Sequence, residues 1–276
     1  MEKYLTDNIS VRGYSHLLSD KECQDNSISW HDKRYSGVII CDGHGGEKYI
    51  RSQKGSLLAC AVGQKAIDEY MSQKHRLDEG NFNVQFKFLE SYIIDNWRKE
   101  VEKDFTDNPL DDDERFNALS DSDKAALIKN PFKAYGSTFI AAVMAKTYYF
   151  VLKLGDGNVN VVLSDGSVKA VDGLEDEQLQ FNVTTSLCQS NAALEFRHIY
   201  VKDESIKGLV LTTDGIINCF KSVESYHALI KNIYDAYSET KNEKDIANAS
   251  SELADGLNQL SEKGSGDDLS VAIAIR

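Results

Sequence analysis

The sequence is poor in cysteine and proline, and it contains no long apolar run. Five cysteines among 276 residues form no CxxC pair, which argues against both a disulfide framework and a structural zinc site. With only two prolines, no proline-rich linker divides the chain. No apolar run reaches the roughly 18 residues of a membrane helix, and residues 1–12 lack the pattern of a signal peptide. We therefore expect a cytoplasmic protein whose residues 1–276 form one domain.

Basic residues are outnumbered, with 31 Lys and Arg against 44 Asp and Glu and a formal net charge of −13. Nucleic acids and anionic membranes are polyanions that a protein of this charge repels, so we expect neither as a partner. The hydrophobic share of 41% and the charged share of 27% are ordinary for a globular protein and argue against disorder.

Short apolar segments alternate with longer amphipathic ones along the chain. Segments rich in Val, Ile and aromatic residues predict strands, and the three between 137 and 163 are interpreted as a meander. Apolar residues at helical spacing predict helices, with a loop-rich connection over 104–130 that contains one short helix near Lys124. This order predicts an α+β fold in which a sandwich of sheets is covered by helices. The expected strands are 35–41, 137–145, 147–154, 159–163, 209–213 and 269–275, and the expected helices are 47–72, 83–105, 226–237 and 245–260.

Single aspartates fall where predicted strands begin or end, and most of them adjoin a glycine. Taken one at a time, an Asp-Gly pair is most simply a turn, which is our interpretation of Asp165. Several carboxylates that meet at one rim of a sheet repel each other unless cations neutralise them. Oxygen ligands without His or Cys suit Mg²⁺ or Mn²⁺ rather than zinc. The five candidate residues are Asp25, Asp42, Asp156, Asp214 and Asp267.

The signatures of four other chemistries are absent from the sequence. There is no GxxxxGK[ST] phosphate-binding loop and no GxSxG serine elbow. No cysteine is followed by arginine at the spacing that cysteine-dependent phosphatases need, and no Asp-x-Asp-x-Thr/Val segment of an aspartyl-phosphate enzyme occurs. The common covalent routes and the nucleotide-binding loop are therefore not indicated.

Six short blocks occur in a fixed order between about residue 20 and residue 276. They are 23–27 (CQDNS), 38–46 (VIICDGHGG), 135–139 (YGSTF), 154–157 (LGDG), 211–215 (LTTDG) and 264–271 (GSGDDLSV). Together they resemble the type 2C, metal-dependent protein phosphatases, the PPM family. Asp-Gly-His-Gly-Gly after a buried strand is a specific signal, and six ordered blocks are a strong one.

The resemblance implies a central antiparallel β-sandwich flanked by pairs of helices, with a site for two Mn²⁺ or Mg²⁺ ions. It implies that Asp42 bridges the two ions and that the carbonyl group of Gly43 binds one of them. Asp214 and Asp267 would complete the first metal site. Asp156 would share a weaker third ion with Asp214.

The resemblance also implies the roles of the remaining residues. Asp25 matches the acidic position that supports the metal pair, directly or through water. The metals, roughly 3.5–4 Å apart, would activate a bridging water that attacks phosphorus in line. His44 is the candidate acid for the leaving alkoxide, unless it only fills the turn. Because successive strand side chains alternate, Asp268 is expected to support the site from behind Asp267 or to face solvent.

Three places depart from the family pattern, and at one of them Gly157-Asn158 stands where the family has Ser-Arg. Gln24 stands where the family has a glutamate, and Asp20 stands where its phosphate-binding arginine is expected. A carboxylate repels phosphate, whereas arginine binds it through two charge-assisted hydrogen bonds. We predict that His16, with Arg12 as the second choice, partly replaces the arginine.

The resulting hypothesis is a metal-dependent serine/threonine protein phosphatase. Its partners would be phosphorylated protein substrates and a cognate serine/threonine kinase. A regulatory pseudophosphatase that binds phosphoproteins or a kinase without turnover is the alternative from another class. The third hypothesis is an enzyme of the same fold that acts on a small phosphorylated metabolite.

Overall fold

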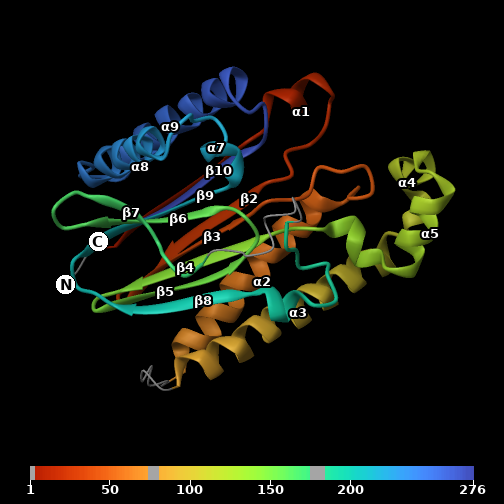
Figure 1. Cartoon of the computed structure of the whole chain (residues 1–276), viewed down its shortest axis with the longest axis horizontal. Coiled ribbons are helices and arrows are strands. Elements are labelled where there is room, and N and C mark those ends of the chain that lie inside the picture. Colours follow the sequence, from red (N-terminus) through yellow and green to blue (C-terminus); the bar gives the residue numbers. More distant parts are fainter. Residues whose placement is uncertain (1–3, 74–80, 175–183) are drawn as a thin grey trace.

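The computed structural model describes residues 4–73, 81–174 and 184–276. Figure 1 shows two stacked sheets with helices on both outer faces. Neighbouring strands are antiparallel in both sheets. The first sheet contains, in order, β1 (Leu5–Val11), β10 (Leu269–Ile275), β9 (Ile206–Thr212), β6 (Asn158–Leu163) and β7 (Val168–Ala170). The second contains β2 (Asn26–His31), β3 (Tyr35–Cys41), β4 (Phe139–Ala145), β5 (Tyr148–Leu154) and β8 (Arg197–Lys202).

Two pairs of long helices form the outer layers. Helices α2 (Ser52–Ser72) and α3 (Phe82–Asp107) cover the second sheet, and α8 (Val223–Ser238) and α9 (Glu243–Lys263) cover the first (Figure 1). A separate hydrophobic cluster fills each of the three interfaces between layers. The predicted α+β sandwich covered by helices is therefore confirmed, because each amphipathic helix buries its apolar face against a sheet.

Several short helices complete the described chain. Two of them have local signals in the sequence, since the side chain of Asp113 accepts from Arg115 N at the start of α4 and that of Ser120 accepts from Asp123 N at the start of α5. Helix α5 is the predicted short helix, and α4 was not expected. The short elements are α1 (Tyr14–Leu18), η1 (Leu110–Asp112), α4 (Glu114–Ala118), α5 (Asp121–Lys129), η2 (Pro131–Tyr135), α6 (Ala192–Glu195) and α7 (Asp214–Ile217).

The predicted meander over 137–163 is wrong in its last strand. Strands β4 and β5 pair as expected, but β6 pairs with β9 and β7 in the other sheet. The chain changes sheets at Gly155, which has φ +114°, and a side chain there would also collide with Thr138. This crossing places Asp156 at the edge where both sheets end. The helix expected from residue 47 begins only at Ser52, because the glycine turn and residues 47–51 precede it without helical structure.

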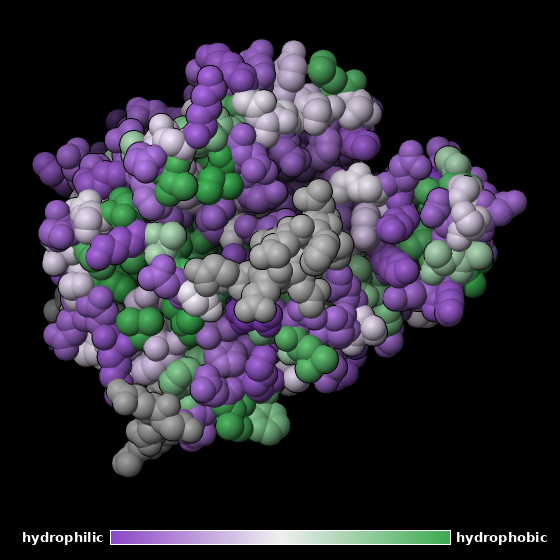
Figure 2. Space-filling model, in the orientation of Figure 1, coloured by the Kyte–Doolittle hydropathy of each residue, from purple (hydrophilic) through white to green (hydrophobic). Residues whose placement is uncertain are grey.

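Polar side chains dominate the visible surface. Figure 2 shows hydrophilic residues over most of one face, with hydrophobic ones in small separate groups. None of the helices in the described ranges is long and apolar enough to span a bilayer.

Helix α2 and η2 approach each other so closely that position 55 requires a glycine. A Cβ at Gly55 would overlap the carbonyl oxygen of Tyr135, and Trp97 Nε1 donates a 3.0 Å hydrogen bond to the Gly55 carbonyl. Tyr135 is followed by Gly136, whose carbonyl accepts from the backbone N–H of His44 at 3.1 Å. The helix contact therefore also fixes the turn that carries His44.

We expect Gly55→Ala to destabilise the protein by about 1–3 kcal/mol, because the added methyl group forces α2 away from η2. Gly256→Ala is the matched control, since nothing lies within 4 Å of a Cβ at that exposed helical position. The control should be stabilising by roughly 0.5–1 kcal/mol, as alanine favours helix over glycine. Urea unfolding of both variants measures the difference. Equal free energies of unfolding for the two variants would contradict the close contact.

Candidate metal centre

Three aspartates bring their carboxylates together at one edge of the sandwich. One oxygen each of Asp42, Asp156 and Asp214 lies within 4.8 Å of the other two, the one such acidic group found in the described residues. Asp42 directly follows β3, Asp156 lies in the turn after β5, and Asp214 begins α7 after β9. Strands from both sheets thus deliver the three side chains, which the sequence places more than 50 residues apart.

Asp25 and Asp267 lie beside this group. Asp25 is buried, with 4% of its surface exposed, and its pKa is raised well above the usual range by burial and by repulsion from Asp268. Burial and repulsion from Asp25 likewise raise the pKa of Asp42. Asp267 sits at the exposed rim, where partial loss of hydration and the nearby acids raise its pKa. The five predicted carboxylates therefore share one electrostatic environment, and three of them form its tight group.

The donor set fits a hard divalent cation. Burial followed by repulsion from Asp156 raises the pKa of Asp214 as well, so several acids of the cluster resist ionisation together. A cation relieves that resistance by compensating the negative charges. All of the donors are carboxylate oxygens, the ligands that Mg²⁺ and Mn²⁺ prefer.

Neutral side chains hold the acids in place. Each of four aspartates has a partner that fixes either its carboxylate or its main chain, and a fixed orientation is what a metal ligand needs. Thr138 and Thr213 lie within blocks that the sequence analysis singled out, but nothing in the sequence marked the other two partners. The contacts are Thr184 Oγ1 to Asp156 Oδ2 (2.7 Å), Thr213 Oγ1 to Asp25 Oδ2 (2.8 Å), Asn218 Nδ2 to Asp214 Oδ2 (3.2 Å) and Asp42 N to Thr138 Oγ1 (2.9 Å).

The glycine turn after Asp42 is tightly packed. A Cβ at Gly43 would lie 2.5 Å from the carbonyl oxygen of Gln24, so only glycine fits there. The His44 ring stands edge-on to Tyr49, with 4.8 Å between ring centroids. Burial lowers the pKa of His44 to about 4, so its ring is neutral at neutral pH.

Asp268 supports the site from behind and does not face solvent. Its Oδ1 accepts from the backbone N–H of Gly13 at 2.6 Å and lies 2.9 Å from Nδ1 of His16. Its Oδ2 accepts from the backbone N–H of Gln24 at 2.6 Å. Only 4% of Asp268 is exposed. This carboxylate therefore joins the loop before Asp25 to the start of the last strand.

Asp20, which stands where the family has its phosphate-binding arginine, does not face the clustered acids. Asp20 has φ +53° and a fully exposed side chain, so it points into solvent rather than at the acids. Arg12 Nη2 donates to Asp20 Oδ1 at 3.2 Å and to the His16 carbonyl at 3.1 Å. Both candidate replacements thus have partners of their own, because His16 is bonded to Asp268. The phosphate contact of His16 stays a prediction.

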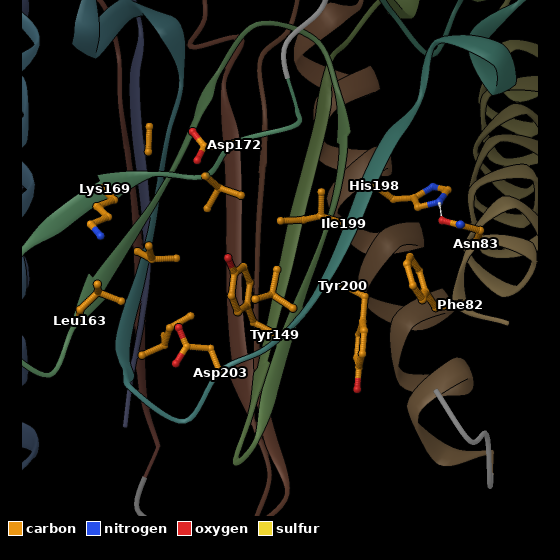
Figure 3. Close-up of a pocket in the computed structure, with 15 residues that line it drawn as sticks. Phe82, Asn83, Tyr149, Leu163, Lys169, Asp172, His198, Ile199, Tyr200 and Asp203 are labelled. Atoms are coloured by element: carbon orange, nitrogen blue, oxygen red, sulfur yellow. Dashed lines mark hydrogen bonds between the residues drawn. The ribbon is translucent and has the colours of Figure 1, made fainter. Parts of the chain in front are cut away.

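Two cavities differ in their relation to the acids. One of about 680 Å³ adjoins the glycine turn, between loop 19–24 and α4. Figure 3 shows another, of about 490 Å³, between β6 and β7 on one side and β5 and β8 on the other. Tyr149 reaches into it, Asp172 and Asp203 lie at its margins, and His198 bonds Asn83 at 3.0 Å. None of the clustered acids lines either cavity, and of the two only the first adjoins the glycine turn that follows Asp42.

Comparison with known proteins agrees with this geometry. The family model described as Protein phosphatase 2C matches residues 12–258. The chain belongs to the protein phosphatase 2C family and is thus a protein phosphatase, an enzyme. No curated protein matches the sequence. Asp267 lies beyond the matched residues, so its place beside the acids comes from the structure.

Solved structures of low sequence identity share the fold. The serine/threonine phosphatase Stp1 from Staphylococcus aureus has a TM-score of 0.60 and 12% identity, with coverage of 100% of this chain and 96% of that one. The catalytic domain of the serine/threonine protein phosphatase PstP, in complex with two manganese ions, has a TM-score of 0.56 and 14% identity, with coverage of 99% and 97%. PppA from Pseudomonas aeruginosa has a TM-score of 0.58 and 13% identity, covering 99% and 98%.

We expect Asp42→Asn to stabilise the metal-free protein more at about pH 7 than at about pH 5. The folded chain holds the Asp42 proton more tightly than the unfolded chain, so wild-type stability falls as pH rises above about 4. Asparagine has no such proton to lose. Thermal unfolding at the two pH values, with a chelator present, measures the difference.

The same variant, and Asp214→Asn, should bind Mn²⁺ at least about tenfold more weakly by calorimetry, a loss of roughly 1.4 kcal/mol. Asp165→Asn is the control, because Asp165 is an exposed turn acid that bonds Ser167 in its own loop. Its Mn²⁺ affinity should equal that of the wild type. Wild-type affinity in both cluster variants would show that the ion binds elsewhere.

Proposed function

We propose that this enzyme hydrolyses phosphoserine and phosphothreonine in proteins at a centre for two Mn²⁺ or Mg²⁺ ions. The observation that carries the proposal is the tight group formed by Asp42, Asp156 and Asp214. Asp25 and Asp267 would complete the ligand set, directly or through water. Asp156 and Asp214 would also hold a weaker third ion.

The chain contributes position and charge to this reaction. Divalent cations supply, when bound, the Lewis acidity that lowers the pKa of a water molecule and neutralises the phosphate. Asp42 lies between the ends of the two sheets, where its carboxylate can face both ions. Because Gly43 has no side chain, the turn can pass close to Gln24. The carbonyl group of Gly43 would be a further ligand. Thr184 and Asn218 keep the carboxylates of Asp156 and Asp214 oriented, so little reorganisation is needed at the moment of reaction.

We propose that His44 hydrogen-bonds the leaving oxygen of the substrate. The neutral ring carries one N–H and can hydrogen-bond a developing alkoxide without a permanent positive charge. The ring packs against Tyr49, and the backbone N–H of His44 donates to the Gly136 carbonyl, so both the ring and its main chain are held. This role matters most for a poor leaving group such as serine or threonine.

Phosphorylated proteins, and the kinase that phosphorylates them, would be the partners. The five cysteines are all free, as expected in the reducing cytoplasm that we propose as the location. The matched family and the described site involve residues from both ends of the chain, and we propose that 1–276 works as one phosphatase domain.

The direct test is turnover of an aryl phosphate and of a phosphothreonine peptide, with Mn²⁺ and with excess chelator. We expect hydrolysis of both with Mn²⁺ and none with chelator, because every proposed metal ligand is an oxygen. Full activity in chelator would rule out the metal mechanism. Peptide binding without turnover would instead support the regulatory pseudophosphatase.

His44→Ala should lower kcat for the phosphothreonine peptide by about 100-fold, because the developing alkoxide loses a hydrogen-bond donor that is already in place. An aryl phosphate leaves as a stabler anion, so the loss there should be much smaller. Steady-state kinetics on both substrates gives the two ratios. Equal losses would mean that His44 supports the turn and has no role at the leaving oxygen.

A further inference from the structure

A cavity of about 720 Å³ lies between α3, α5, η2 and residues 188–190. Three of its lining residues are basic, namely Arg98, Lys129 and Lys133, and none is acidic. This composition contrasts with the net charge of −13 and with the cavity beside the glycine turn, which three acidic residues line. Basic residues therefore predominate around this cavity, although the protein as a whole is acidic.

The three bases have no acidic partner in the described ranges. Arg98 is held by a 2.8 Å hydrogen bond from Nη2 to the Gln189 carbonyl and by packing over the ring of Phe132. Its Nη1 makes no hydrogen bond to the described residues. A guanidinium fixed in this way loses little freedom when it binds an anion.

One residue that lines the cavity, Asn130, carries a hydrogen-bond acceptor in addition to these cationic donors. Oδ1 of Asn130 is buried and has no hydrogen-bond partner among the described residues. It can accept a hydrogen bond from a backbone N–H of a peptide. An acidic peptide carries both anionic side chains for the cations and N–H groups for this acceptor.

The cavity lies close to the metal centre. Lys133 precedes Gly136 by three residues, so their Cα atoms are at most about 11 Å apart, and the Gly136 carbonyl accepts from the backbone N–H of His44. Lys48 acts electrostatically on His44 and on Cys188, a residue of the cavity wall. An extended peptide advances about 3.3 Å per residue, so about three residues span a distance equal to that between Lys133 and Gly136.

We propose that this cavity is a subsite for an anionic side chain of the substrate, two to four positions from the residue that is dephosphorylated. Arg98, Lys129 and Lys133 would bind the anion, and Asn130 would accept an N–H of the same peptide. The group bound is a carboxylate or a second phosphate, which share negative charge. The inference rests on the proposed function, because it assumes that phosphorylated residues reach the metal centre.

The test compares kcat/KM for phosphothreonine peptides of one length with Mn²⁺ present. One peptide has neutral flanks, two carry glutamates at the second to fourth positions on either side, and one carries a second phosphoserine there. We expect a preference of about tenfold for glutamate on one side, falling as salt rises. The doubly phosphorylated peptide tells which anion binds better.

Lys129→Glu/Lys133→Glu should abolish or reverse the preference for the acidic peptide over the neutral one. The matched control is Lys241→Glu/Lys244→Glu, the same charge change at exposed positions beside the start of α9, in the opposite helix layer. The control should retain the preference, because charges at positions 241 and 244 lie far from the cavity and change only the net charge of the protein. Equal changes in both double variants would overturn the subsite.

Two further outcomes separate this inference from the proposed function. A wild-type enzyme that hydrolyses all peptides equally, at every salt concentration, keeps its proposed function and has no anion subsite. A wild-type enzyme that hydrolyses neither the peptides nor an aryl phosphate with Mn²⁺ overturns the proposed function, and the subsite with it.

Discussion

Mutual repulsion among half-buried carboxylates is the constraint around which this protein is organised. Asp42, Asp156 and Asp214 would move apart if their strands were free to do so. They stay together because β3, β5 and β9 are anchored in hydrophobic layers on both faces. The apolar layers thus supply the free energy that holds an unfavourable arrangement of charge, which the proposed cation would neutralise.

The buried carboxylate of Asp268 connects the acidic cluster to other parts of the chain. Asp268 receives hydrogen bonds from Gly13 and Gln24, and these place Asp25 beside the cluster. It also binds the His16 ring, so the loop where the family has its arginine is shaped by the same residue. On the opposite side, η2 holds His44 through Gly136. The proposed metal centre is therefore held from two directions, by the start of the last strand and by the helical segment before β4.

Sequence patterns predicted the parts of this fold whose signals are local. The apolar runs of β3, β4, β5 and β10 are nearly continuous and were found, whereas β1 and β8 mix polar and apolar residues and were missed. The meander failed because no local signal says that the chain changes sheets at Gly155. The candidate acids could be named from the sequence because each stands beside a strand end in a recognisable block. Thr184 and the burial of Asp268 could not be found, since their partners lie 28 and at least 244 residues away.

The position of β10 has a consequence for synthesis of the protein. β10 lies between β1 and β9, and Leu5 pairs with Ile275. While the ribosome is still making the chain, β1 has no neighbour in its sheet, and β9 lacks one of its two. The second sheet needs only residues up to 202 and can form earlier. The emerging chain therefore exposes unpaired strand edges until β10 appears, and during that interval it is open to chaperones and to wrong pairing with other chains.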